Sequence, residues 1–234
     1  MDDDLLIAPD AETTRLLLVC PDRPGLIATV SGFLAEAGLN IVDVDQHSTA
    51  AGRFFMRMVF DSPGAEERGA LEERFVREIA APFEMEHSFS ESSRQKKVAV
   101  MVSREDHCLS DLLWRRRNGH LGGEIAMVIS NHEDLRAEVE AVGLPFHHVP
   151  VTRDSKDEAE RRVLELIGAT AHYVTAELDA GPIIDQDVVR VGHGDEVPDL
   201  VRIGRDVERL VLARAVTAHL EDRVLVDGER TVVF

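Results

Sequence analysis

The first ninety residues carry a pattern of apolar and polar positions that is typical of a small α+β unit. An apolar run at 15–20 predicts a buried strand, and the residues at 21–25 predict a tight turn. Apolar residues then recur at helical spacing, and two alternating stretches joined by a short turn predict a hairpin. The predicted elements are a strand at 15–20, a helix at 26–38, strands at 40–49 and 54–61, a helix at 65–83 and a strand at 84–91. This β-α-β-β-α-β order predicts a ferredoxin-like fold.

The pattern changes after a polar, aperiodic stretch at 91–96, which we interpret as a linker. Residues 97–103 form a continuous apolar strand, as expected where both faces of a parallel sheet are covered. Helices and strands then alternate, at 107–119, 124–131, 132–143 and 145–151, followed by a helix that ends at Ile167. This alternation predicts a doubly wound, mostly parallel α/β sheet.

One connection in this second part is unusually short. The helix that ends at Ile167 runs directly into an apolar stretch, 168–174, that is typical of a buried strand, and Gly168 alone separates them. Connections from helix to strand usually take about 2–6 residues, and a parallel crossover needs at least about ten. The connection is shorter than expected, which raises the question of whether chain is missing at this point.

Composition and charge exclude several classes of protein. The formal net charge of −18 argues against a nucleic-acid surface, because a negative field repels phosphate. No apolar run approaches the ~18 residues of a membrane span, and the acidic N-terminus lacks a secretory pattern. Cys20 and Cys108 form neither a disulfide framework nor a zinc spacing, which favours a reducing compartment. We expect a cytoplasmic protein without membrane or nucleic-acid partners.

The segment DRPGL after the first strand, together with the element order, resembles an ACT domain, which is a small regulatory module. The resemblance implies an ACT domain at 12–90. It also implies that the turn of Asp22, Pro24 and Gly25 faces a bound amino-acid effector across a dimer interface, so that a homo-oligomer is expected. The alternative is that these residues form only a tight turn.

The second part carries a more specific resemblance in five segments, which are 97–113, 125–135, 144–152, 168–189 and 201–216. They are similar to the catalytic domain of the formyltetrahydrofolate deformylases, which have the formyltransferase fold and an ACT domain ahead of it. The resemblance implies a catalytic domain at 97–234. It also implies hydrolysis of 10-formyltetrahydrofolate to formate and tetrahydrofolate, in one-carbon metabolism and formate supply for purine synthesis, without a metal or redox cofactor.

The same resemblance identifies what is missing. In the family, a strand, a helix and a further strand ending in an Asn-Ile-His-His-Ser type of loop precede the GATAHYV strand, and none of them is present between Ile167 and Gly168. The family uses an Asn, a His and an Asp to activate water and to stabilise the oxyanion. Only the Asp has a counterpart here, Asp179, and His172 matches a histidine that supports its loop. We therefore expect severely impaired activity.

Other candidate residues have structural alternatives. The resemblance places Ser103, His107 and Cys108 near the non-folate side of the pocket, and Gly181 and Pro182 in the loop of Asp179. These positions are equally compatible with a helix entry and a turn.

The pair Asn131 and His132 is compatible with a replacement catalytic pair, but a helix cap explains it more simply. His147 and His148 point to opposite faces of a strand, which argues against a metal site. The cluster at 115–117 is typical of a solvated or interface helix end.

The missing strands also predict a property of the sheet. In the family they lie in its interior, so the strand at 97–103 loses a neighbour and presents an apolar edge. Because catalytic groups are missing as well, two alternatives to an impaired deformylase remain. One is a non-catalytic ACT-domain regulatory or dimerisation protein, and the other is a defective gene product.

Overall fold

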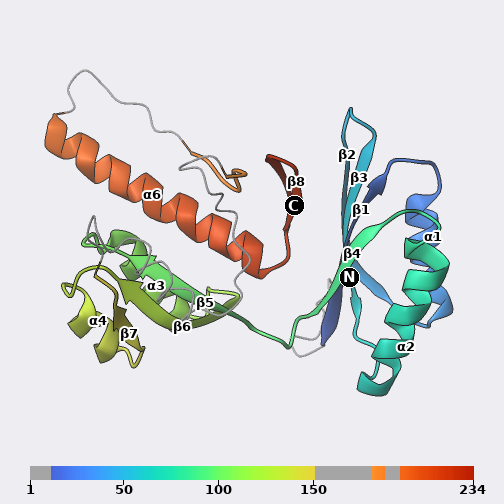
Figure 1. Ribbon diagram of the computed structural model, residues 1–234, viewed down its shortest axis with the longest axis horizontal. Helices are drawn as coiled ribbons and strands as arrows, with labels where there is room; N and C mark the ends of the chain where they lie inside the picture. Colours follow the sequence, from blue (N-terminus) through green and yellow to red (C-terminus); the bar gives the residue numbers. More distant parts are fainter. Residues whose placement is uncertain (1–11, 151–180, 188–195) are drawn as a thin grey trace, which may run out of the picture. The chain divides into compact units, whose positions relative to one another are not determined.

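The structure is a computed structural model that describes residues 12–150, 181–187 and 196–234 (Figure 1). These residues divide into two compact units. The first contains the chain up to Arg94 together with Asp222–Asp227 and Thr231–Phe234, and the second contains Gln95–Glu221 with Gly228–Arg230. The division after Arg94 falls inside the stretch 91–96 that we interpreted as a linker.

The first unit has the predicted element order. Its elements are β1 (Thr13–Pro21), α1 (Leu26–Glu36), β2 (Ile41–Ser48), β3 (Arg53–Asp61), α2 (Ala65–Phe75), the π-helical turn η1 (Val76–Ala80) and β4 (Glu86–Glu91). The strands form one antiparallel sheet in the order β2-β3-β1-β4. This arrangement confirms the ferredoxin-like prediction, and only the π-helical end of the second helix was not predicted.

The helices cover one face of this sheet and enclose a continuous core. Alternate residues of β1 and β3 contribute to it, among them Leu16 and Met56, because successive strand residues point to opposite faces. Phe75 at the end of α2 is fully buried, and its ring meets those of Phe33 and Phe89 edge to face at 5.4 and 5.3 Å. Such aromatic pairs stabilise a core beyond their buried area.

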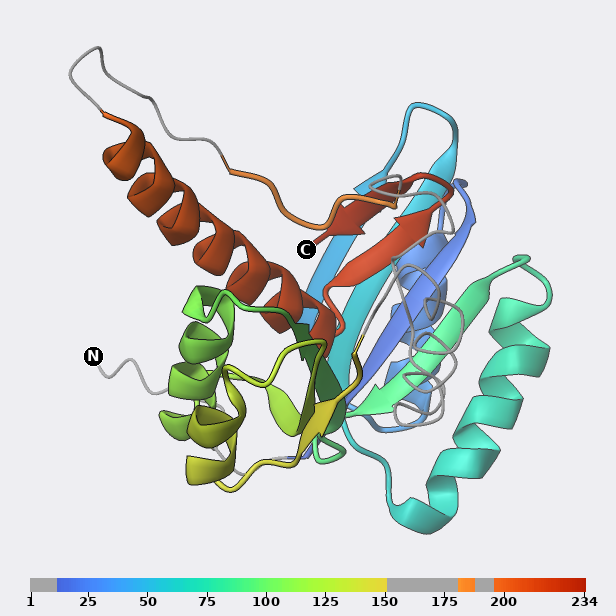
Figure 2. The ribbon, with the colours of Figure 1, turned by 60° about the vertical axis from the view of Figure 1, so that its left-hand side comes forward.

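The second unit contains β5 (Lys96–Val102), α3 (His107–Arg117), β6 (Gly123–Ser130), α4 (Arg136–Ala141), β7 (Phe146–His148) and the long helix α6 (Val197–Leu220). The strands are parallel, in the order β5-β6-β7. Figure 2 shows α3 and α4 on one side of this sheet, where Leu109, Val128 and Val139 share a core with Leu220 of α6. The predicted parallel α/β sheet is confirmed for these strands. The helix ending at Ile167 and the strand at 168–174 lie outside the described residues.

Two parts of the second unit differ from the prediction. The strand β5 is only half-buried, and Met101 is 58% exposed, although the sequence predicted cover on both faces. Within the described residues β5 pairs with β6 alone, as expected when a neighbouring strand is missing. The helix predicted at 132–143 begins only at Arg136, because turns occupy 131–135. Asn131 is therefore not a helix N-cap and His132 is not in a first helical turn, so that interpretation was wrong.

The C-terminus forms a hairpin of β8 (Val224–Asp227) and β9 (Arg230–Val233). We expected the domain at 97–234 to include it. In the structure, Asp222–Asp227 and Thr231–Phe234 belong to the first unit instead. Sequence patterns did not reveal this grouping, because it depends on contacts across more than a hundred residues.

Candidate active site

The candidate site begins at the carboxyl ends of β5 and β6, the edge where parallel sheets place their ligands. Ser103 follows β5 and is exposed. Its carbonyl oxygen accepts a hydrogen bond from Ser130 Oγ at 3.3 Å, and the same hydroxyl oxygen accepts one from the backbone N–H of His132 at 3.1 Å. The buried hydroxyl of Ser130 thus ties together the two loops that leave this edge.

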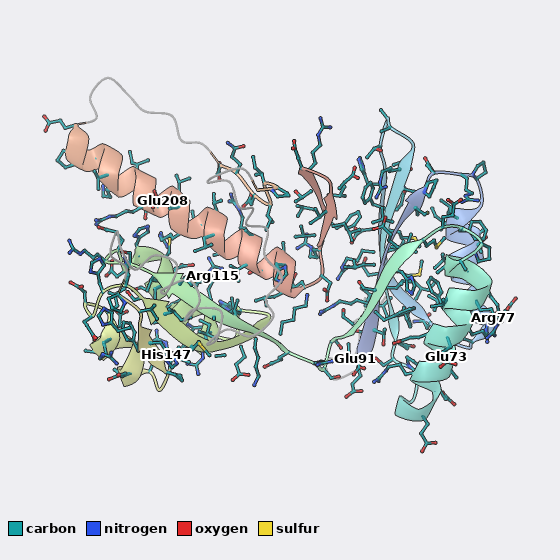
Figure 3. The ribbon with its side chains drawn as sticks, in the orientation of Figure 1. Glu73, Arg77, Glu91, Arg115, His147 and Glu208 are labelled. Carbon is teal, nitrogen blue, oxygen red and sulfur yellow. The ribbon has the colours of Figure 1, made fainter. Side chains whose placement is uncertain are left out.

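His107 begins α3 directly after the Ser103 loop. Its Nε2 lies 2.8 Å from Glu208 Oε2 on α6, the residue labelled on that helix in Figure 3. Its other ring nitrogen, Nδ1, is buried and has no hydrogen-bond partner among the described residues. A histidine whose contact is an exposed helix carboxylate is positioned by helix packing, and this arrangement does not identify a catalytic base.

Cys108 follows His107 and is half-buried. Burial raises the pKa of its thiol, and the nearby carboxylates of Glu208 and Asp111 raise it further. The thiolate is the nucleophilic form of cysteine, so a raised pKa leaves Cys108 protonated and unreactive at neutral pH. Cys108 can line a pocket but does not supply a covalent step.

Gly181 and Pro182 are half-buried and open a described segment at 181–187. This segment is held on α6 by Arg214, whose Nε lies 2.5 Å from Asp185 Oδ2 and whose Nη2 lies 3.0 Å from Asp187 Oδ2. These hydrogen bonds raise the pKa of Arg214 above its ordinary value. Arg214 was missed from the sequence, because an arginine on a helix gives no sign of partners about thirty residues earlier.

Asp179 and His172, the two catalytic candidates, lie outside the described residues. The assignment of their roles stays a prediction from the sequence. The described chain resumes at Gly181, in the segment that Arg214 anchors.

The loop after β6 has a different role from the one the sequence allowed. His148 Nδ1 lies 2.8 Å from Glu133 Oε1, and the hydrogen bond from Arg136 lowers the pKa of Glu133. The side-chain oxygen of Asn131 is buried and has no hydrogen-bond partner in the part of the chain that the structure describes. No contact of the described residues assigns a catalytic role to Asn131, and a replacement role for it stays untested.

The remaining candidates have local partners. Arg115, labelled on α3 in Figure 3, lies 2.6 Å from Asp111, and Arg116 donates to the carbonyl oxygen of Val142 at 3.5 Å. Groups of three or more metal-ligating side chains do not occur among the described residues. Nor does any described helix have the length and apolarity to cross a membrane.

In the first unit, the predicted effector turn lies between β1 and α1. Asp22 and Pro24 are exposed, and the backbone N–H of Asp22 donates to the carbonyl oxygen of Gly52 at 2.8 Å. Gly25 precedes α1 at φ 92° and no side chain caps the helix. Because this backbone conformation is open mainly to glycine, Gly25 brings backbone N–H groups to the surface at a helix start.

Comparisons with known proteins agree with both units. The ACT domain family model matches residues 14–79. The chain is 44% identical to formyltetrahydrofolate deformylase of Mycobacterium tuberculosis strain H37Rv, over 96% of this chain and 91% of that protein, and 39% identical to that of Bacillus subtilis, over 94% and 93%. A crystal structure of a formyltetrahydrofolate deformylase from Pseudomonas syringae superposes with a TM-score of 0.89 at 38% identity, covering 97% of this chain and 95% of that one.

The length of the alignment supports the internal loss. The match to the Mycobacterium tuberculosis protein extends over 283 positions, whereas this chain has 234 residues. At least 49 positions of the relative therefore have no counterpart here. The sequence places the loss between Ile167 and Gly168. The chain belongs to the formyltetrahydrofolate deformylase family, as a member that lacks an internal stretch of the catalytic domain.

Proposed function

We propose that this protein is a formyltetrahydrofolate deformylase, which hydrolyses 10-formyltetrahydrofolate to formate and tetrahydrofolate, and that the missing stretch strongly reduces the turnover of this chain. The activity places it in one-carbon metabolism, where formate supplies purine synthesis. The observation that carries the proposal is the alignment. Identity remains at 44% across almost the whole chain, yet at least 49 aligned positions are absent.

The reduction follows from the chemistry of formamide hydrolysis. Water must attack the formyl carbon while a base removes its proton, and donors must hold the oxyanion that forms. The carboxylate of Asp179 orders the water in this proposal, and His172 supports its loop. The Asn and His that complete the site belong to the missing stretch. Losing one oxyanion donor costs about 10²–10³ in rate, and losing several members of a catalytic unit is not additive.

The remaining site residues form the walls of the pocket. Ser103, His107 and Cys108 line the side away from the folate, and Gly181 with Pro182 shapes the loop after Asp179. The resemblance to the family implies that the reaction uses no metal or redox cofactor. We place the protein in the cytoplasm, as a homo-oligomer that binds an amino acid at the turn of its ACT unit.

The experiment is a formate-release assay with 10-formyltetrahydrofolate and the full chain. The proposal predicts a rate close to the uncatalysed background, with any residual rate abolished by Asp179→Asn. The control variant is Asp61→Asn, at the exposed end of β3. Full turnover at the rate of a complete relative contradicts the proposed reduction. Residual formate release that survives Asp179→Asn contradicts the role of Asp179.

A second candidate is a non-catalytic ACT-domain protein that dimerises or senses an amino acid. The observation in its favour is the contrast in completeness, because the first unit has all its elements while the second lacks a stretch of chain. Calorimetric titration of the full chain with the twenty amino acids is combined with the formate-release assay. Residual formate release that Asp179→Asn abolishes favours the first candidate, and amino-acid binding with no formate release above the background favours the second.

A further inference from the structure

The face of the ACT sheet that bears no helix is buried. Alternate residues along β1 and β3 point away from α1 and α2. They include Leu17, Val19, Phe55 and Val59, of which none is more than 9% exposed. None of these residues belongs to the core beneath the helices. A layer of apolar side chains on a second sheet face requires a cover.

The C-terminal hairpin supplies polar contacts to this face. Asp222 Oδ2 accepts a hydrogen bond from Ser90 Oγ at 2.6 Å and pairs with Arg15 Nη1 at 3.3 Å. Asp227 Oδ1 lies 3.0 Å from Arg53 Nε. These contacts reach β4, β1 and β3 in turn, and both Figure 1 and Figure 2 show the hairpin alongside these strands.

The contacts of Asp222 are largely shielded from water. Its side chain is 11% exposed and that of Arg15 is 20% exposed. Val224, two residues later, is also buried, at 7% exposure. A charge-assisted hydrogen bond in such surroundings stabilises more than an exposed ion pair does.

The backbone conformation of Asp222 also indicates that the start of the hairpin has a defined position. Asp222 has a φ of 54°, a left-handed conformation that non-glycine residues rarely adopt. Aspartate is among the few side chains that tolerate it. The conformation turns the chain immediately after α6, which ends at Leu220, and starts the hairpin.

We propose that the C-terminal hairpin is an intramolecular clasp, in which Asp222–Asp227 docks on the helix-free face of the ACT sheet through Arg15, Ser90 and Arg53. The clasp closes this face to other partners. The folded ACT unit is therefore discontinuous in sequence. It needs the C-terminal residues in addition to 12–90.

The first test is hydrogen exchange of the full chain at increasing denaturant, below the unfolding transition. The clasp predicts that amides of β8 and β9 lose protection together with those of β1 and β3, because docking makes them one cooperative unit. Hairpin amides that exchange like an unfolded chain overturn the proposal. Hairpin amides that lose protection with β5 and β6, while β1 stays protected, also overturn it.

The second test uses Asp222→Asn in the full chain, which keeps the size of the side chain and removes its charge. Exchange of the hairpin amides should accelerate about 10- to 100-fold, as expected for losing hydrogen bonds to a charged group. The matched control is Asp206→Asn, which removes the exposed pair with Arg209 on α6, whose atoms lie 3.2 Å apart. Equal effects of the two variants contradict the clasp.

A double variant checks that Arg15 and Asp222 act together. Arg15→Gln alone should accelerate hairpin exchange, and adding Asp222→Asn should accelerate it by less than Asp222→Asn does alone, because the ion pair is already broken and only the hydrogen bond from Ser90 is left to weaken. Fully additive effects show that the two residues act independently and overturn this part of the clasp.

Discussion

Two strands with the same apolar character show how differently the two units are built. The strand β1 reads LLLVC at its centre and lies between β3 and β4, and its residues 16–20 are buried. The strand β5 reads VAVMV and is only half-buried, with Met101 58% exposed. Within the described residues it has one neighbour. The burial of a strand depends on its neighbours as much as on its own residues.

The comparison shows where the loss of chain has its effect. The first unit keeps its sheet, both layers around it and one continuous core. In the second unit, the helix side of the sheet has a large core, whereas Ile129 and Val149 are the buried members of a small cluster that is separate from it. We attribute the half-exposed β5 in the described part of this unit to the missing stretch.

The largest effect is expected from restoring the stretch. Inserting the matching segment of the Mycobacterium tuberculosis relative between Ile167 and Gly168 should give β5 its neighbour. Amide exchange in β5 should slow by about 100-fold or more, since paired interior strands open only in large unfolding events. A glycine-serine insertion of equal length is the control. If both insertions leave β5 exchange unchanged, the contrast between the units has another cause.

A core truncation should affect one unit only. Phe75→Ala removes a fully buried ring that meets Phe33 and Phe89, and should lower the unfolding free energy of the ACT unit by about 3–5 kcal/mol. The fluorescence of Trp114, the single tryptophan, reports the second unit and should change little. Ile27→Ala, at a 44% exposed position, is the surface control. If the unfolding transition reported by Trp114 shifts as far as that of the ACT unit, the two units do not unfold independently.

The second unit has its own sensitive position at Gly123. A Cβ atom there would lie 2.7 Å from the carbonyl oxygen of Lys96 and 2.8 Å from Leu220 Cδ2. Gly123→Ala should therefore cost about 1–3 kcal/mol in the Trp114 transition. The neighbouring Gly122→Ala is a matched control, because its nearest contact is an ordinary 3.5 Å from Glu221. If both variants lose the same unfolding free energy, Gly123 is not closely packed between Lys96 of β5 and Leu220 of α6.

The smallest effect tests the turn of the ACT unit. Gly25→Ala places a side chain at φ 92° with no atom within 4 Å, so only backbone strain, about 1–2 kcal/mol, should lower the stability of this unit. Gly32→Ala, inside α1 and also free of close contacts, should raise it by about 1 kcal/mol. Thermal unfolding measures both variants. If their unfolding temperatures shift in the same direction, the assignment of strain to Gly25 is wrong.

The sequence predicted the elements of the ACT unit well because strand alternation and helical spacing are local signals. Gly25 and the turn before it were recognised for the same reason. The length of α4 was overestimated, since the apolar residue Leu135 continues the helical pattern although turns occupy 131–135.

The contacts that were missed connect distant residues. Arg214 with Asp185, Asp222 with Ser90, and the Ser130 hydroxyl with its two loops depend on tertiary packing. The alternation of residues along one strand gives no sign of them. The family resemblance identified Asp179 and His172, but their geometry lies outside the described residues and their roles stay predictions.

The most direct measurement compares formate release from 10-formyltetrahydrofolate by two proteins, this chain and the same chain with the relative's stretch restored between Ile167 and Gly168. The restored protein should be faster by at least about 10³, because several catalytic groups return together. Its rate should fall again with Asp179→Asn. Equal rates for the two proteins would show that the remaining residues suffice for hydrolysis, and would contradict the account.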